Sequence, residues 1–206
     1  MKKKMIGFYD YTVILTYGGL VSALFGVFYA VNSRFLAAIV CLGISLICDT
    51  LDGKVARRKR NRTEQESNFG VQIDSLCDMV SFGVFPGIFF FQLGVSEKFD
   101  FLLIMGYCLC CVIRLGYFNV LAMDDNEEKG VFHGLPVVTM AIFIPLIYMV
   151  KVLWITDAAF VWALRGMLFL FALLYVLDFK FYKPKMPVLI VLFLIFWIPT
   201  TILFFI

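Results

Sequence analysis

Long apolar segments constrain this sequence more than any other feature, because several of them reach the roughly 20 residues that an α-helix needs to cross a bilayer. The chain of 206 residues is 62% apolar and has a mean hydropathy of +0.93, which excludes an ordinary soluble domain and a disordered chain. We therefore predict one membrane domain over residues 1–206, with an all-α fold that is a polytopic bundle of about seven transmembrane helices. The expected spans run approximately over Phe8–Tyr29, Phe35–Leu51, Asn68–Leu93, Phe99–Leu121, Pro136–Trp154, Ala158–Leu177 and Pro187–Ile206.

Lysine and arginine are distributed unevenly over the predicted loops. With a cytoplasmic N-terminus, thirteen of the eighteen face the cytoplasm, Arg114 and Arg165 lie within spans, and the other three, Arg34, Lys98 and Lys151, face outward. Cytoplasmic loops of membrane proteins carry an excess of basic residues, so we predict this orientation. The lipid bilayer is the expected partner of such a chain, and no nucleic acid is expected.

Four aspartates form two closely spaced pairs at the ends of predicted spans. Asp49 and Asp52 are three residues apart, and Asp74 and Asp78 are four apart. On a helix, either spacing puts both carboxylates on one face. The first pair ends the second span and the second pair begins the third, so we expect all four at the same membrane side on adjacent antiparallel helices. The stretch between the pairs, KVARRKRNRTEQES, is predicted to be a water-facing linker.

Carboxylates at membrane depth cost about 2.5–3.5 kcal/mol each, so four together need a compensating charge. The apolar segments hold no matching set of basic residues. Hard divalent cations such as Mg²⁺ or Mn²⁺ suit oxygen ligands, and two of them would balance four carboxylates. Two-metal sites are typical of displacement at phosphorus. The alternative, aspartates that cap helices at the membrane surface, is weaker for four residues at these spacings than for one.

These residues also carry a resemblance to a known family. The pattern Asp49-x-x-Asp52-Gly53-x-x-Ala56-Arg57, followed by Gly70-x-x-x-Asp74-x-x-x-Asp78, resembles the signature of the CDP-alcohol phosphotransferases at all eight motif positions. These integral membrane enzymes transfer a substituted phosphate from a CDP-linked donor to an alcohol. The resemblance implies a catalytic core of six helices and, commonly, a homodimer. One departure is the link of twelve residues between Arg57 and Gly70, which is longer than in most of the family.

The resemblance implies a role for each motif residue. Asp49, Asp52 and Asp74 would chiefly bind metal, and Asp78 would act as the general base with a share in metal binding. The CDP-linked donor would be held by Asp49, Asp52, Gly53, Ala56, Arg57 and Gly70. Taken alone, the arginine is equally one member of a solvated basic run, and only its motif position favours phosphate binding.

Three further segments narrow the acceptor. Phe69–Pro86, Arg114–Asn119 and His133–Pro136 are similar to the bacterial and archaeal phosphatidylserine synthase branch of that family. This implies CDP-diacylglycerol and L-serine as substrates, with the site facing the cytoplasm of a bacterial or archaeal cell. Arg114 and Asn119 are the candidate acceptor-binding residues, with the arginine on the carboxylate of serine. The arginine is otherwise explained as a structural counter-charge for an aspartate.

Three hypotheses follow. The first is a serine phosphatidyltransferase, and the second is a sibling enzyme that uses inositol, glycerol phosphate or another alcohol. The third is a divalent-cation transporter, which predicts acidic residues spread along the membrane depth in several spans. The four aspartates are confined to one end of two spans, which favours an enzyme. His133 is interpreted as an interfacial loop residue, and Arg165 has no motif context.

Overall fold

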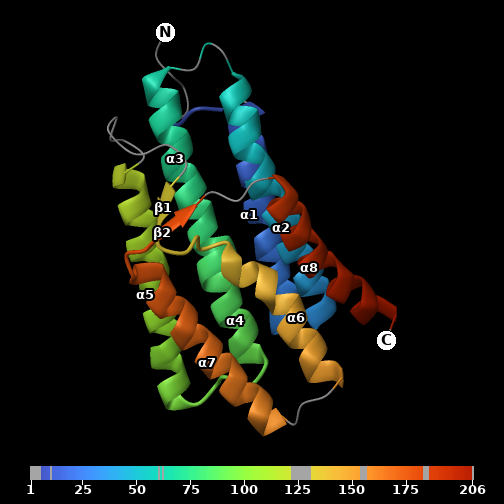
Figure 1. Cartoon of the computed structure of the whole chain (residues 1–206). Coiled ribbons are helices and arrows are strands. Elements are labelled where there is room, and N and C mark those ends of the chain that lie inside the picture. Colours follow the sequence, from blue (N-terminus) through green and yellow to red (C-terminus); the bar gives the residue numbers. More distant parts are fainter. Residues whose placement is uncertain are drawn as a thin grey trace.

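The chain forms an up-and-down bundle of helices (Figure 1). The computed structural model describes residues 6–9, 11–59, 61, 63–121, 131–153, 157–182 and 186–205. Its helices are α1 Tyr11–Val31, α2 Phe35–Arg58, α3 Glu64–Asp78, a π-helix over Met79–Val84, α4 Phe85–Gln92, α5 Lys98–Leu121, α6 Thr139–Leu153, α7 Asp157–Val176 and α8 Met186–Phe205. Two strands of three residues each, β1 Val131–His133 and β2 Lys180–Tyr182, pair in antiparallel fashion.

The predicted polytopic membrane bundle is confirmed. Within the described residues, five helical segments are long and apolar enough to cross a bilayer: Tyr11–Val31, Phe35–Ala56, Glu64–Gln92, Lys98–Leu121 and Asp157–Val176. Two shorter apolar helices, Thr139–Leu153 and Val191–Phe205, bring the apolar helical segments to the predicted seven. Large side chains on the outer faces, such as Phe28, Leu109 and Trp162, are more than half exposed. An apolar exterior of this kind matches a lipid environment.

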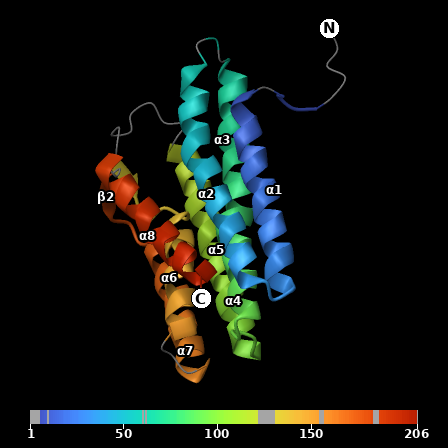
Figure 2. The same cartoon turned by 90° about the vertical axis from the view of Figure 1, so that its right-hand side faces the viewer.

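Helix α1 packs closely against its neighbours through small residues. A Cβ atom added at Gly26 would lie 2.6 Å from the Phe85 ring and 3.2 Å from the Cβ of Cys41, so these helices approach within a distance that only glycine permits. The Ser22 hydroxyl donates a hydrogen bond of 2.8 Å to the Cys41 carbonyl. Small and hydroxyl-bearing residues at helix contacts are typical of membrane bundles. Figure 2 shows α1 lying beside both α2 and α3.

The predicted linker between the aspartate pairs is mostly helical, which corrects the expected span boundaries. Helix α2 continues past Leu51 to Arg58, and α3 begins at Glu64 rather than Asn68. Lysine, arginine and alanine are good helix formers, so a polar sequence extends α2 beyond its apolar part. The Thr63 side chain and the Glu66 backbone and carboxylate form a reciprocal capping box that starts α3. The long link therefore adds helical turns, and among its described residues only Lys59, Asn61 and Thr63 lie outside the helices.

A π-helix directly follows the second aspartate pair. It lies between α3 and α4 without a break, so residues 64–92 form one continuous helical segment. The Tyr107 hydroxyl on α5 donates a hydrogen bond of 2.7 Å to the Phe82 carbonyl in this π-helix. In a π-helix the backbone hydrogen bonds join residues five apart instead of four. Here a side chain from a neighbouring helix also donates a hydrogen bond to one of its carbonyls. The sequence analysis did not predict this element.

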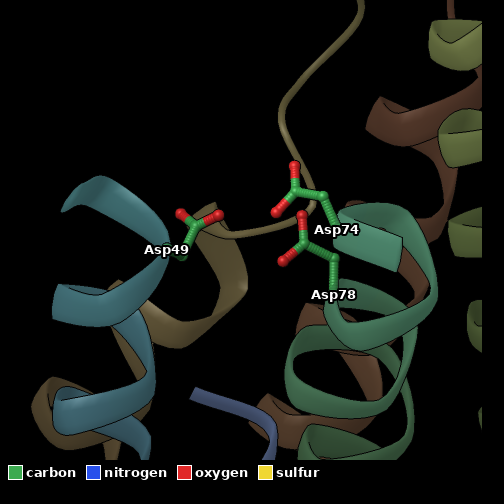
Figure 3. Close-up of side chains that lie close together, drawn as sticks. All are labelled: Asp49, Asp74 and Asp78. Carbon is green, nitrogen blue, oxygen red and sulfur yellow. The ribbon is translucent and has the colours of Figure 1, made fainter. Parts of the chain in front are cut away.

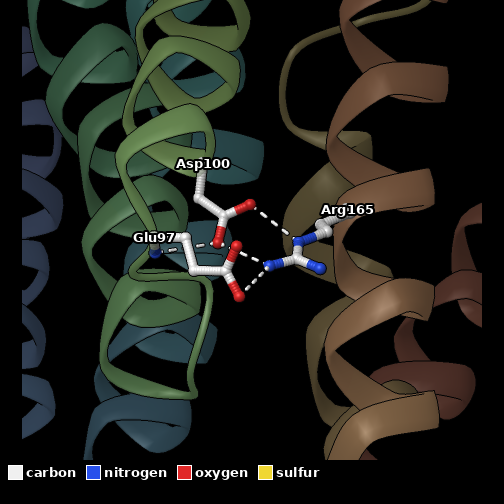
Figure 4. A network of polar contacts seen from close by, with 3 residues as sticks. All are labelled: Glu97, Asp100 and Arg165. Atoms are coloured by element: carbon white, nitrogen blue, oxygen red, sulfur yellow. Dashed lines mark hydrogen bonds and ion pairs between the residues drawn. The ribbon is translucent and has the colours of Figure 1, made fainter.

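Arg165, for which the sequence predicted no role, forms an ion-pair network between α7 and the start of α5 (Figure 4). Its Nε and Nη2 atoms donate hydrogen bonds of 2.7 and 2.9 Å to the two carboxylate oxygens of Asp100. The Glu97 carboxylate lies 3.3 Å from the same guanidinium, which also packs over the Trp162 ring. This network lies at the end of the bundle opposite the α2–α3 loop (Figure 1). We interpret it as a structural connection between α5 and α7.

Candidate active site

Three of the four aspartates converge between α2 and α3. Asp49 on α2 faces Asp74 and Asp78 on α3, and each offers a carboxylate oxygen such that all three oxygens lie within 4.8 Å of one another (Figure 3). Opposite ligands of a Mg²⁺ ion lie about 4.2 Å apart. The carboxylates therefore match a hard divalent cation in donor type and nearly in spacing, so the cluster can hold a metal ion.

The two helices bring the aspartates to the same depth because the loop between them is short. Asp49 lies nine residues before the end of α2 at Arg58, and Asp74 lies ten residues after the start of α3 at Glu64. At the rise of an α-helix these separations correspond to about 14 and 15 Å. The predicted antiparallel arrangement is present, and because α3 starts at Glu64 rather than near Asn68, Asp74 lies in its third turn.

Asp52 lies beside the other three aspartates and has a partner from α1. Its side chain is buried, and its Oδ2 atom accepts a hydrogen bond of 2.8 Å from the Thr16 hydroxyl. The sequence analysis did not identify this threonine. A signal was present, since Thr12 and Thr16 are spaced four residues apart and are hydroxyl-bearing residues in an otherwise apolar segment.

All four aspartates line one small central cavity. Its volume is about 10 Å³, comparable to the space that one water molecule needs. The polar groups around it come from three elements: α1, α2 and the continuous segment formed by α3 and the π-helix. The lining residues are Thr16, Gly19, Leu20, Ser45, Asp49, Asp52, Asp74, Cys77, Asp78, Ser81 and Phe82.

A larger pocket, called here the donor pocket, adjoins the cavity between α1, α2 and α3. Its volume is about 190 Å³, and Asp52 and Asp74 form one wall. Gly53, Ala56 and Gly70, the predicted donor-binding residues with the smallest side chains, all line it. Thr12, Val13, Thr16 and Val71 complete the lining. The Arg57 side chain lies outside the described residues.

A third pocket, called here the acceptor pocket after the candidate acceptor-binding residue Arg114, also borders the carboxylates. Its volume is about 100 Å³, and Asp49 and Asp78 line it together with Arg114 of α5. The remaining lining residues are Leu115, Phe118, Pro136, Val137 and Val138. The four carboxylates thus divide between two pockets: Asp52 and Asp74 line the donor pocket, and Asp49 and Asp78 line the acceptor pocket.

Arg114 is held in the wall of the acceptor pocket. Only 5% of the residue is exposed, its Nε atom donates a hydrogen bond of 3.3 Å to the Leu135 carbonyl, and its guanidinium lies 5.4 Å from the Phe118 ring centroid. Because Asp49 and Asp78 line the same pocket, both explanations from the sequence remain open: a ligand for an acceptor anion, or a counter-charge for the aspartates.

Asn119, the second candidate acceptor residue, connects α5 to α3. Its Oδ1 atom accepts a hydrogen bond of 2.7 Å from the Ser75 hydroxyl, and its Nδ2 atom donates one of 3.3 Å to Gln72 Oε1. It is not among the described residues that line the acceptor pocket. His133 belongs to β1, but its side chain lies outside the described residues.

The sequence is similar to a known protein family and to several known proteins. The family described as CDP-alcohol phosphatidyltransferase matches residues 12–205. The chain is 39% identical over 114 residues to the CDP-diacylglycerol–serine O-phosphatidyltransferase of Saccharomyces cerevisiae, covering 52% of this chain and 40% of that protein. It is 30% identical over 160 residues to the archaetidylserine synthase of Methanothermobacter thermautotrophicus, covering 77% of this chain and 66% of that protein.

A further relative is the CDP-diacylglycerol–serine O-phosphatidyltransferase of Helicobacter pylori strain J99. It is 30% identical over 140 residues, covering 67% of this chain and 56% of that protein. The chain therefore spans less than two thirds of the length of each of these relatives. No solved structure matches the chain.

Proposed function

The chain belongs to the CDP-alcohol phosphatidyltransferase family, and on that premise we propose that it transfers the phosphatidyl group of CDP-diacylglycerol to L-serine, giving phosphatidylserine and CMP. The observation that carries this proposal is the position of the four aspartates between two pockets. In a displacement at phosphorus, the attacking hydroxyl of the acceptor and the leaving group of the donor lie on opposite sides of the phosphorus atom. The names of the relatives supply the identity of the two substrates.

The donor would occupy the pocket lined by Gly53, Ala56 and Gly70, where small side chains leave room for the nucleotide. Arg57 would bind a phosphate. Asp49, Asp52, Asp74 and Asp78 would hold two divalent ions, Mg²⁺ or Mn²⁺, whose charge would offset that of the pyrophosphate as its bridging bond breaks.

The reaction joins the serine hydroxyl oxygen to the phosphatidyl phosphorus and breaks the bond from that phosphorus to the bridging oxygen, which leaves with CMP. The hydroxyl proton must be accepted by a group within hydrogen-bond reach. Asp78 lines the acceptor pocket as well as the central cavity, which supports its assignment as the general base. Asp74 lines the donor pocket instead, which supports its assignment as a metal ligand.

Arg114 would bind the serine carboxylate, because it is a buried cation in the wall of the acceptor pocket. The names of the relatives favour serine over inositol as the acceptor. Asn119 would act on the acceptor only indirectly, through the contact of α5 with Ser75 and Gln72. We further propose that the aspartates face the cytoplasm of a bacterial or archaeal cell, that the chain forms a single domain, and that it assembles as a homodimer.

The test is a lipid-product assay on the purified protein with CDP-diacylglycerol, Mg²⁺ or Mn²⁺ and a panel of serine, inositol and glycerol 3-phosphate. We expect phosphatidylserine and CMP in equal amounts with serine, loss of turnover in excess EDTA, and recovery when Mg²⁺ or Mn²⁺ is restored. A product formed only with another alcohol contradicts the serine assignment. Full turnover in EDTA, with no metal retained by the protein, contradicts the metal assignment.

A further inference from the structure

We propose that Tyr175 of α7 is a positioning residue that shapes the acceptor pocket, so that acceptor recognition depends on a helix outside the motif. This inference rests on the proposed function, because it concerns the acceptor side of the same site. None of the eight motif residues lies on α7. The connection runs through the turn of residues 134–138, which leads from β1 to α6.

The contact itself is a buried hydrogen bond to the wall of the pocket. The Tyr175 hydroxyl donates a hydrogen bond of 2.8 Å to the Val137 carbonyl. Tyr175 is 2% exposed and Val137 is 4% exposed, so the bond is sealed from solvent. Val137 and its neighbours Pro136 and Val138 line the acceptor pocket together with Arg114. Tyr175 therefore fixes the backbone that forms this wall.

Backbone contacts hold the same turn against the end of α7. The Leu135 amide donates a hydrogen bond of 3.2 Å to the Leu174 carbonyl, and the Gly134 amide donates one of 2.9 Å to the Phe179 carbonyl. From the other side, Arg114 Nε donates to the Leu135 carbonyl. The turn thus lies between α7 and the arginine. A shift of the turn would move the carbonyl that orients Arg114 and the part of the pocket wall that the turn forms.

Gly134 permits this close approach. Its φ of +71° is a left-handed conformation that residues with a Cβ atom rarely adopt. A Cβ atom added there would lie 3.1 Å from the Leu177 carbonyl oxygen and 3.3 Å from that of Tyr175. An alanine at this position would push the turn away from α7. Gly134→Ala therefore perturbs the contact between this turn and α7 through the turn, whereas Tyr175→Phe perturbs it through α7.

Among the described residues, none from α7 or from this turn lines the donor pocket or the central cavity. Loss of the Tyr175 hydroxyl should therefore raise the KM for the acceptor while the affinity for CDP-diacylglycerol stays unchanged. A rise of roughly 2- to 12-fold is expected, the factor that corresponds to the net contribution of one hydrogen bond. A purely stabilising role for the tyrosine would instead lower thermal stability without separating the two substrates.

The experiment compares Tyr175→Phe with Ser22→Ala in the full chain. Ser22 is the matched control because its hydroxyl also donates a hydrogen bond of 2.8 Å to a backbone carbonyl on another element, that of Cys41. Neither Ser22 nor Cys41 is among the described residues that line the central cavity, the donor pocket or the acceptor pocket. For each variant we would measure the KM for serine, the KM for CDP-diacylglycerol, kcat, the thermal midpoint, and donor binding by titration at fixed Mg²⁺.

We expect a selective rise in the serine KM for Tyr175→Phe and Gly134→Ala, and no selective rise for Ser22→Ala. Equal changes in the serine KM for Tyr175→Phe and Ser22→Ala, or an equal rise in the donor KM for Tyr175→Phe, would overturn the inference. If the wild-type protein uses another alcohol, the serine assignment fails. The inference then stands or falls by the KM for that alcohol.

Discussion

At the scale of single residues, Asp74 and Asp78 have different surroundings although they lie one turn apart on α3. Both line the central cavity, but Asp74 also lines the donor pocket, whereas Asp78 also lines the acceptor pocket. Asp52 and Asp49 on α2 divide in the same way. Spacing along the chain puts each pair on one helix face, but it does not say which member of the pair lines which pocket.

This division predicts different effects for the same substitution at the two positions of α3. Asp78→Asn should lower turnover by about 10²–10⁴-fold, the usual contribution of a general base, while largely preserving metal and donor affinity. Asp74→Asn should weaken metal binding and, with it, binding of CDP-diacylglycerol. Turnover and donor titration at fixed Mg²⁺ measure both effects. If Asp78→Asn loses donor binding as completely as Asp74→Asn, then Asp78 is a metal ligand and the base lies elsewhere.

At the scale of the helices, the packing of α1 decides how closely the aspartate-bearing elements approach. Gly19 lies against Cys48 of α2, and a Cβ atom added there would be 3.1 Å from that of the cysteine. Gly26 lies against both Cys41 and Phe85. Gly18 is adjacent to Gly19 in the sequence, yet no atom lies within 4 Å of the position that its Cβ would occupy. Close packing of α1 therefore requires glycine at positions 19 and 26 but not at position 18.

Gly26→Ala should destabilise the bundle, because the new methyl group would lie only 2.6 Å from the Phe85 ring. Overpacking of this kind typically costs about 1–3 kcal/mol. Gly18→Ala is the matched control and should be neutral or stabilising, since glycine within a helix is less stable than alanine by roughly 0.5–1 kcal/mol. Thermal unfolding in detergent measures both. Equal midpoints for the two variants would show that α1 does not pack as closely as described.

At the scale of the whole molecule, successive helical segments run in opposite directions, so the connections between them alternate between the two ends of the bundle. The α2–α3 loop lies at one end, and the turn from α4 to α5 lies at the other (Figure 1). The basic residues around the first of these loops make it the expected cytoplasmic end. The Arg165 network joins α5 to α7 at the opposite end, away from the aspartates.

Cysteine labelling in intact cells tests this orientation. Asn61 lies in the α2–α3 loop and Ser96 lies between α4 and α5, and both are exposed. A membrane-impermeant maleimide should label Ser96→Cys from outside and should label Asn61→Cys only after the membrane is opened. The parent protein gives the background from its own six cysteines. Labelling of Asn61→Cys in intact cells would reverse the proposed orientation.

Much of the fold and of the aspartate cluster could be predicted because the responsible signals are local. Apolar runs of about 20 residues indicate membrane helices whatever surrounds them. The spacings of Asp49 with Asp52 and of Asp74 with Asp78 place each pair on a helix face without knowledge of the fold. The extension of α3 to Glu64 also had a local signal, the capping-box residues Thr63 and Glu66, although apolar content alone led to a later start.

Only the tertiary structure decided what surrounds the carboxylates. Thr16 and Asp52 are 36 residues apart, and Tyr175 and Val137 are 38 apart, so neither hydrogen bond follows from a helical period. The π-helix after Asp78 likewise has a partner that is distant in the sequence, the hydroxyl of Tyr107 on α5, which donates to the Phe82 carbonyl. Helical periodicity determines which residues share a face, but the division of the aspartates between two pockets arises from side chains that meet only when distant helices pack together.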